Sequence, residues 1–242
     1  MALELYLDLF SQPCRAVYIF AKANGIPFVF KEVALIQGQH KTEEYGKVNP
    51  MKKVPALKDG DFTLSESNAI LRYLARKFKT PDHWYPSDLQ KCARVDEYLS
   101  WQHTNTRKCN SKLYTAKALL PLLLGQPAPP ERLEQLMKEL NEILDLLEDK
   151  FLQDRAFVAG SDISLADLLA VVDFMQPLGA GYDVFEGRPK LAAWRSRVQQ
   201  AVGKELFEEA HRELFRERDW KFDRLSPEEK EQLTQNMLKY VQ

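Results

Sequence analysis

Residues 3–33 read LELYLDLFSQPCRAVYIFAKANGIPFVFKEV, and the hydrophobic spacing changes twice within this stretch. Leucines alternate with other residues over 3–9, which is typical of a strand. Over 13–23 the apolar residues follow helical spacing, and the Asn-Gly pair that comes next indicates a helix end. Residues 28–33 are aromatic and β-branched, which favours a second strand. A strand, a helix and a strand within about 30 residues predict a βαβ unit.

A hairpin signal follows this unit. Residues 54–57 (VPAL) and 62–64 (FTL) are apolar runs on either side of Lys58-Asp59-Gly60-Asp61. Asp-Gly between apolar runs is a strong indicator of a tight turn between two strands. A helix is expected from about Glu66, because the apolar residues that follow share one helix face: Ile70, Leu71, Leu74 and Phe78.

The rest of the chain has helical spacing only. Residues 79–88, KTPDHWYPSD, are rich in Pro, Asp and Ser and are typical of a linker. One long helix is expected over 88–120, with its end near Pro121. Further helices are predicted at 133–151, 165–176, 189–201, 204–217 and 227–240. The fold class is therefore α/β plus all-α, with an α/β domain at 1–79, a linker at 80–87 and an all-helical domain at 88–242.

The segment 165–176 is apolar nearly all round, as expected of a helix at the centre of a bundle. Ser164 and Asp167 are spaced as in a capping box, so we expect this helix to begin at Leu165.

Composition excludes several classes of protein. The 242 residues include 34 Lys and Arg and 35 Asp and Glu, a net charge of -1 that gives no general attraction to nucleic acid or an anionic membrane. No apolar run approaches the ~18 residues of a membrane span, and Met1-Ala2-Leu3-Glu4 lacks the basic start of a secretory signal. The cysteines and histidines show neither disulfide nor metal-ligand spacing, so no metal is expected: Cys14, Cys92, Cys109, His40, His83, His103 and His211.

The turn after the first strand is the first candidate site, because ligands gather at the carboxyl ends of strands in open α/β sheets. Ser11 is placed to cap the next helix, and Cys14 follows Pro13 in its first turn. The local sequence leaves two alternatives open. Ser11 is only a cap and Cys14 a small buried residue, or the helix N-terminus favours a bound anion such as a thiolate.

The motifs together resemble the cytosolic glutathione transferases. They are LELYLDLFSQPCRAVYIFAK (3–22), Lys53-Val54-Pro55 before the hairpin and Ser65-Glu66-Ser67 at the start of a helix. With VDEYL (95–99) and DKFL (149–152), they are most similar to the theta class. The resemblance implies a thioredoxin-like N-terminal domain followed by an all-helical domain, glutathione as co-substrate, and a cytoplasmic homodimer.

The resemblance also implies roles for individual residues. Ser11 would donate a hydrogen bond to the glutathione sulfur, and Val54, before a cis proline, would pair with the cysteinyl backbone. Glu66 and Ser67 would hold the γ-glutamyl end, since a carboxylate suits its ammonium, while a hydroxyl and helix N-terminal amides suit its carboxylate. The cationic residues expected to meet the glycine carboxylate are His40, Lys41 and Lys53.

In the helical domain, Thr104 and Arg107 are three residues apart and so share a helix face. The resemblance implies that this face reaches the glutathione site. Some related sequences carry an acidic residue near position 104, so Thr104 departs from that pattern. Arg107 is either a cation on the substrate side or a structural ion-pair partner.

We therefore expect a theta-type transferase that joins glutathione thiolate to small hydrophobic electrophiles such as alkyl or aralkyl halides and organic peroxides. The alternative is a transferase-like fold kept as a non-catalytic binding or assembly module, because fold alone does not decide function. A thiol-disulfide reductase acting through Cys14 would lack a second thiol at position 11.

The segment 225–242 predicts a terminal helix. Ser226, Pro227 and Glu229 form a strong helix start. The apolar residues that follow make a single stripe: Leu233, Met237, Tyr240 and Val241. Two placements satisfy this stripe, against the core of the helical domain or as a lid over the electrophile pocket.

Overall fold

The computed structural model describes residues 2–216 and 226–241. Position 217 of a predicted helix, and positions 225 and 242 of the predicted terminal segment, lie outside the described residues.

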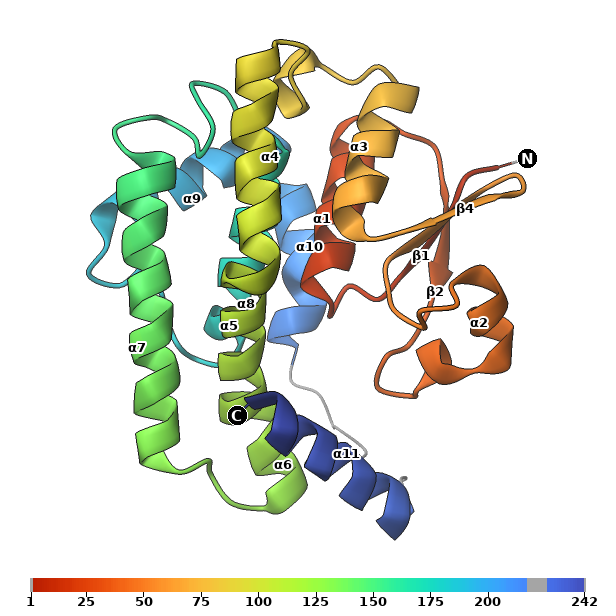
Figure 1. Ribbon diagram of the computed structural model, residues 1–242, viewed down its shortest axis with the longest axis vertical. Coiled ribbons are helices and arrows are strands. Elements are labelled where there is room, and N and C mark those ends of the chain that lie inside the picture. Colours follow the sequence, from red (N-terminus) through yellow and green to blue (C-terminus); the bar gives the residue numbers. More distant parts are fainter. Residues whose placement is uncertain (1, 217–225, 242) are drawn as a thin grey trace.

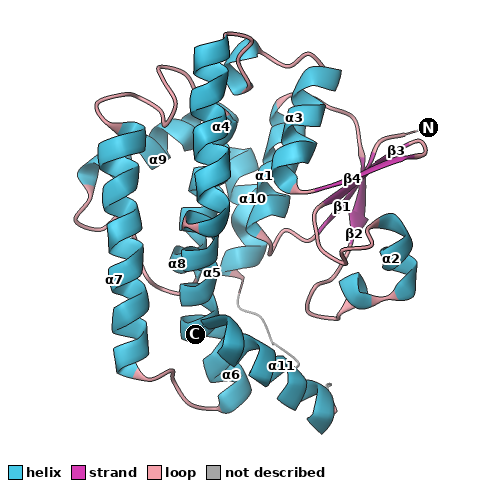
Figure 2. Ribbon diagram, viewed as in Figure 1, coloured by secondary structure: helices cyan, strands magenta, loops and turns pink. Residues whose placement is uncertain are grey.

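The N-terminal part is a four-stranded sheet with helices on both faces (Figures 1 and 2). Its strands are β1 (Glu4–Leu7), β2 (Val29–Glu32), β3 (Ala56–Asp59) and β4 (Phe62–Ser65), in the spatial order β2-β1-β3-β4. β1 pairs with β2 in parallel and with β3 antiparallel. The helices α1 (Gln12–Ala23) and α3 (Ser67–Lys77) cover one face and α2 (Glu43–Val48) lies on the other. This is the thioredoxin-like domain that the resemblance implied.

The hairpin is tighter than the sequence predicted. β3 and β4 extend to the pair Asp59 and Phe62, so only Gly60 and Asp61 remain in the turn. Gly60 has φ +64°, a conformation that costs glycine little. Of the apolar run at 54–57, Val54 and Pro55 precede β3, which begins at Ala56.

The single helix predicted over 88–120 is wrong, because the chain breaks at Asn105. α4 (Leu89–Thr104) ends where Asn105 adopts φ -108° and ψ -87°, and the Asn105 side chain donates to the Trp101 carbonyl at 2.8 Å. A side-chain amide that satisfies a terminal carbonyl gives the backbone an alternative to continuing the helix. α5 (Thr106–Tyr114) then begins one residue later.

Pro121 does not end the helical run either. After a π-helical turn (Thr115–Leu119), α6 (Leu120–Leu124) begins with Pro121 in its first turn, where the missing N–H costs no helical hydrogen bond. Gly125, at φ +69°, ends it.

The remaining helices agree with the predicted order. They are α7 (Pro130–Leu146), continued by a π-helical turn (Leu147–Leu152), α8 (Leu165–Gly179), α9 (Pro189–Val202), α10 (Lys204–Phe215) and α11 (Pro227–Val241). Within the described residues, no helix is long and apolar enough to cross a bilayer.

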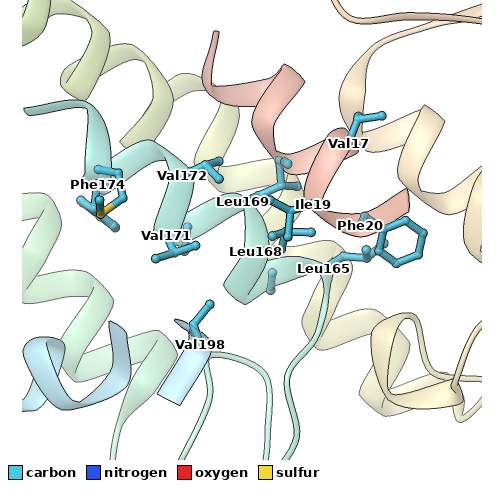
Figure 3. Close-up of a cluster of buried hydrophobic side chains, with 14 of the residues drawn as sticks. Val17, Ile19, Phe20, Leu165, Leu168, Leu169, Val171, Val172, Phe174 and Val198 are labelled. Carbon is cyan, nitrogen blue, oxygen red and sulfur yellow. The ribbon is translucent and has the colours of Figure 1, made fainter. Parts of the chain in front are cut away.

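α8 is the centre of the helical domain, as its sequence predicted. The capping box is confirmed, since Asp167 accepts from the Ser164 backbone N–H at 3.0 Å. Figure 3 shows that α8 packs directly on α1, with Ile19 beside Leu168 and Leu169. The cores of the two domains are therefore one continuous cluster.

The predicted linker is packed against this core. It contains a short 3-10 helix (Asp82–Trp84), and Trp84 is 4% exposed with its ring edge against Phe20 at 5.3 Å between centroids. The Pro-, Asp- and Ser-rich composition of this linker gave no indication that the Trp84 side chain would be buried.

His211 on α10 is a buried titratable group in this core. It is 1% exposed, and its Nδ1 lies 2.7 Å from the carbonyl oxygen of Phe207. Burial, reinforced by the charge of Arg15, lowers the pKa of His211 to about 3.

We therefore expect acid to destabilise the protein through His211. Between pH 6.5 and about 3 the unfolded chain binds a proton that the folded chain does not, so stability is lost as the pH falls through this range. The variant His211→Gln lacks this linkage. Between pH 7 and pH 5 it should lose about 1–2 kcal/mol less unfolding free energy than the parent protein. Urea denaturation of both proteins at the two pH values measures the difference, and equal losses would contradict the expectation.

Candidate functional site

Ser11 lies at the first turn after β1, as the N-cap of α1. Its backbone is extended (φ -81°, ψ 126°), and its hydroxyl accepts no hydrogen bond from a backbone N–H of the first turn, although it makes a side-chain hydrogen bond with Cys14 in that turn. The capping interpretation therefore accounts for the position of Ser11 but does not use its hydroxyl. Pro13 in the first turn of α1 is also one of the residues around a cavity described below.

Asp8 organises the turn that carries Ser11. One carboxylate oxygen accepts from the Phe10 N–H and the other from the Leu35 N–H, both at 2.9 Å. The Ser11 N–H donates to the Asp8 carbonyl at 2.9 Å. The sequence did not single out Asp8, although an Asp side chain often accepts a hydrogen bond from the backbone N–H two residues later in a turn, as Asp8 does from Phe10.

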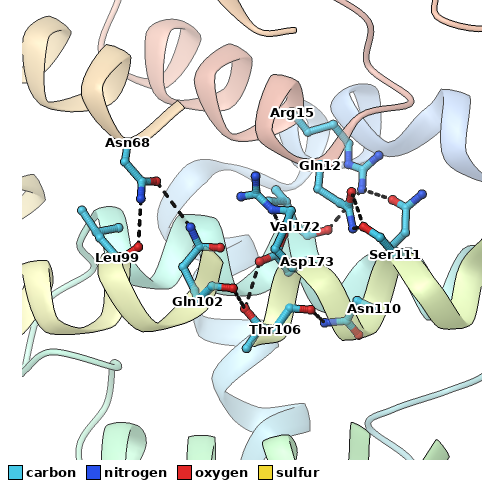
Figure 4. Close-up of polar contacts among 12 residues, drawn as sticks. Gln12, Arg15, Asn68, Leu99, Gln102, Thr106, Asn110, Ser111, Val172 and Asp173 are labelled. Atoms are coloured by element: carbon cyan, nitrogen blue, oxygen red, sulfur yellow. Dashed lines mark hydrogen bonds and ion pairs between the residues drawn. The ribbon is translucent and has the colours of Figure 1, made fainter. Parts of the chain in front are cut away.

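Arg15 joins the same turn to the helical domain. Its side chain is fully buried, and Nη1 donates to the carbonyls of Leu9 and Phe10 at 3.0 and 2.9 Å. Nη2 donates to α8, at the Val172 carbonyl and the Gln176 side chain. Burial lowers the pKa of Arg15 to about 9, so the guanidinium keeps its charge at neutral pH. Figure 4 shows Arg15 directed toward Val172 of α8.

The loop before β3 has the predicted cis peptide bond, between Val54 and Pro55. Two side chains hold this loop through one carbonyl. The Tyr45 hydroxyl and the Asn49 amide each donate to the Lys53 carbonyl at 2.7 Å. The backbone of Val54 is therefore presented by a fixed loop.

Glu66 precedes α3 in an unusual conformation. Its φ is +68°, which is disfavoured for a residue with a side chain, and its carboxylate makes no capping hydrogen bond. Such conformations cluster at ligand sites. Ser67 follows as the first residue of α3 and is 6% exposed.

A cavity of about 150 Å³ joins these elements to the helical domain. It includes five of the residues singled out from the sequence, namely Lys53, Val54, Glu66, Ser67 and Arg107. The other lining residues are Pro13, Asn49, Met51, Pro55, Ser65 and His103. Ser11, His40, Lys41 and Thr104 are not among the lining residues.

His40 and Lys41 lie in a short 3-10 helix (Gln39–Lys41). Burial and the neighbouring Lys41 lower the pKa of His40, and its Nδ1 has no hydrogen-bond partner among the described residues. The Lys52 ammonium donates to the Lys41 carbonyl at 2.9 Å, which connects this helix to the loop that carries Lys53.

Arg107 lines the cavity and also forms an ion pair. Its Nε donates to the fully buried Asp173 at 2.7 Å, which confirms the structural interpretation. Thr106 donates to the other oxygen of Asp173 at 3.0 Å. Burial raises the pKa of Asp173 and the Arg107 guanidinium opposes this shift. Nη2 of Arg107 has no hydrogen-bond partner among the described residues, so the cation retains a free donor beside the cavity.

His103 lines the cavity, whereas Thr104, the last residue of α4, does not. The sequence offered a signal for His103, because it is four residues from Arg107 and that spacing also shares a helix face.

Cys14 is enclosed in the core. It has no exposed surface, and burial raises the pKa of its thiol to about 12. A thiol with this pKa is protonated at neutral pH and cannot act as a nucleophile. The described residues contain no group of three or more potential metal ligands.

α11 approaches the same region from the C-terminal end. Its predicted start is confirmed, since Glu229 accepts from the Ser226 N–H at 2.8 Å. It packs on α5 and α6, and Val241 is buried. Burial raises the pKa of Tyr240, and a hydrogen bond with the Ser111 side chain opposes this shift. Ser111 itself accepts from Gln12 at 3.0 Å, beside Ser11.

Two family models match the chain: the glutathione S-transferase N-terminal domain over residues 1–76 and the glutathione S-transferase C-terminal domain over residues 113–201. Glutathione S-transferase theta-1 of Homo sapiens is 60% identical over 220 residues, which cover 91% of this chain and 92% of that protein. The theta-1 protein of Gallus gallus is 50% identical over an alignment of 260 residues that covers 100% of both chains.

Solved structures agree with the sequence matches. Apo human glutathione S-transferase T1-1 superposes with a TM-score of 0.92 at 56% identity, covering 99% of this chain and 100% of that one. Human glutathione transferase theta-2, in complex with glutathione and an unknown ligand, superposes with a TM-score of 0.90 at 49% identity, covering 99% and 98%. The chain is therefore an enzyme of the glutathione S-transferase family and belongs to its theta class.

Proposed function

We propose that this enzyme binds glutathione in the cavity between its domains and that the Ser11 hydroxyl stabilises the glutathione thiolate for attack on small electrophiles. The observation that carries the proposal is the position of Ser11. Its hydroxyl caps no backbone N–H of α1, and Pro13, two residues further along the same helix, lines the cavity together with Val54 and Glu66. The complex of human theta-2 with glutathione supports the choice of ligand.

The charges around the cavity match the groups of glutathione. Glu66 and Ser67, at the start of α3, suit the ammonium and the carboxylate of the γ-glutamyl end. The Val54 backbone suits the cysteinyl peptide group, which would pair with it like an added strand. The groups proposed to meet the glycine carboxylate are the cations Lys53 and Lys41 and, as a ring N–H donor, His40. Thr104 and Arg107 are assigned to the side of the site formed by the helical domain.

The hydrogen bond from Ser11 accounts for part of the rate. A hydrogen bond to a charged partner contributes ~1.5–3 kcal/mol, which corresponds to ~1–2 pKa units. This brings a thiol near the model value of ~8.5 close to neutrality. Nucleophilicity falls with pKa at a slope of ~0.4–0.5, so the gain at pH 7 is modest. Placing the electrophile beside the sulfur supplies the remaining rate acceleration.

The proposed substrates are alkyl or aralkyl halides and organic peroxides. With a halide, the sulfur lone pair forms the S–C bond while halide leaves with the C–halogen electron pair, and the thiol proton passes to solvent. With a peroxide, the thiolate attacks oxygen and releases an alcohol, and a second glutathione reduces the sulfenic acid to the disulfide and water. Turnover of a panel of both classes tests this assignment, and no turnover of any member would favour the non-catalytic binding module.

We further propose a homodimer in the cytoplasm, without a metal cofactor, with domains at 1–79 and 88–242 joined by 80–87. Similarity to theta-class proteins along the whole chain supports this description.

Ser11→Ala tests the central assignment. Folding and glutathione affinity should be nearly unchanged, while the pKa of the bound thiol rises by ~1–2 units because the hydroxyl donor is lost. Ultraviolet absorbance of the bound thiolate against pH measures this value. Cys14→Ala, on the same helix, is the control and should keep most of the activity. An unchanged titration in Ser11→Ala would refute the assignment.

Glu66→Ala and Ser67→Ala should act on binding. Each should weaken glutathione affinity by ~1–3 kcal/mol, since a charged group of the ligand loses its partner, with little change in the thiol pKa. Calorimetry gives the affinity directly. Glu43→Ala removes an exposed carboxylate from the first turn of α2, outside the cavity, and should bind normally. Parental affinity in both test variants would place the γ-glutamyl end elsewhere.

Ending the chain at Arg224 tests whether α11 is a lid. Its contact with Ser111, next to the Gln12 contact, supports the lid, so the shortened protein should fold and bind glutathione while turnover and substrate preference change. Thermal unfolding and kinetics with two electrophiles of different size report both properties. Unfolding of the shortened protein, or kinetics like those of the full chain, would instead make α11 a structural element.

A further inference from the structure

The turn that carries Ser11 is bonded to the helical domain on both sides. On the N-terminal side of Ser11, the carbonyls of Leu9 and Phe10 accept hydrogen bonds from Nη1 of Arg15. Nη2 of the same guanidinium donates to α8. After Ser11, the Gln12 amide donates to Ser111 of α5 at 3.0 Å. Figure 4 shows Gln12 and Arg15 both directed at the helical domain. The position of Ser11 therefore depends on residues far away in the sequence.

We propose that Gln176, on α8 of the helical domain, is a positioning residue that sets the direction of the Ser11 hydroxyl through Arg15. The inference rests on the proposed role of Ser11. Gln176 does not line the glutathione cavity, and it is 4% exposed.

The geometry of Arg15 supports this route. Its Nη2 donates to the Gln176 side-chain oxygen at 2.6 Å and to the Val172 carbonyl at 3.1 Å, so the contact with Gln176 is the shortest that the guanidinium makes. A guanidinium is a planar fork, so fixing one nitrogen fixes the direction of the other. That other nitrogen holds the two carbonyls immediately before Ser11.

Burial makes this contact significant. Arg15 has no exposed surface, so water does not replace a lost acceptor, and a charged donor without a partner is costly in the interior. Losing the Gln176 oxygen therefore favours reorientation of the guanidinium toward other acceptors. The Leu9 and Phe10 carbonyls would follow, and a hydrogen bond weakens steeply when its angle departs from linearity.

A purely structural role for Gln176 makes a different prediction. If the residue only stabilises the domain interface, its loss lowers the melting temperature and leaves the titration of the bound thiol unchanged. Gln176 is neutral, so removing it does not change the charge near the thiolate. Any change in the thiol pKa would therefore have to arise from geometry.

The main variant is Gln176→Met, which keeps the length of the side chain and removes the strong acceptor. We expect the pKa of the bound thiol to rise by about 0.3–1 unit, which lowers the thiolate fraction about two- to tenfold below that pKa. Because the more basic thiolate is also more nucleophilic, kcat should fall by about 1.5- to 3.5-fold. At high pH kcat should recover, and KM for glutathione should stay within about twofold, because binding groups are untouched.

Gln102→Met is the matched control. Gln102 is another fully buried glutamine of the helical domain, and it contacts Asn68 instead of Arg15. It should lose comparable thermal stability with no change in the thiol titration. Gln176→Asn, whose shorter side chain does not span to Arg15, is the second variant if Gln176→Met fails to fold, and the same direction is expected.

The double variant Ser11→Ala with Gln176→Met tests the route. Without the Ser11 hydroxyl, loss of Gln176 should raise the thiol pKa no further. The inference is overturned if Gln176→Met titrates like the parent protein, or if it adds the same increment in the Ser11→Ala background. If Ser11→Ala alone titrates like the parent protein, the proposed role of Ser11 fails and this inference fails with it. A shift in Ser11→Ala without one in Gln176→Met overturns the inference alone.

Discussion

Burial of α1 on all sides is the constraint on which the rest of the structure depends. The sheet needs an apolar cover on the face of Leu5 and Leu7, and α8 needs a partner for a surface that is apolar all round. α1 satisfies both, and every residue from Cys14 to Ala21 is buried. Because one helix belongs to both cores, its N-terminus with Ser11 has a defined position relative to both domains.

Placing a helix between two domains also buries polar groups, and these are paired across the boundary. Arg15 finds four acceptors, two in its own domain and two on α8. Asp173 on α8 is instead paired within the helical domain, with Arg107 and Thr106 of α5. Each pair prevents the large cost of an isolated buried charge, and the contacts of Arg15 with α8 select one relative arrangement of the domains more than they add stability. The candidate site inherits that arrangement.

The cavity is lined mainly by groups at the ends of helices and strands and in the loops beside them. Val54 is presented by the loop that Tyr45 and Asn49 hold, Glu66 by the backbone conformation at the start of α3, and Arg107 by the break at Asn105. Terminal positions suit such a task, because their backbone groups are free to meet a ligand while the elements behind them are rigid. The lining groups also carry both signs of charge, as a zwitterionic peptide requires.

The sequence by itself determined the elements whose signals are local. Alternation in 3–9, the hairpin with its turn at Gly60 and Asp61, and the box formed by Ser164 and Asp167 each depend on neighbours a few residues apart. Motif resemblance added the family and the cis bond before Pro55. Only the tertiary structure decided that the helix breaks at Asn105 and that Arg15 meets Gln176. Arg15 and Gln176 are 161 positions apart. Periodicity reports which face of an element is apolar, whereas the partner of a buried charge is chosen by the packing of whole helices.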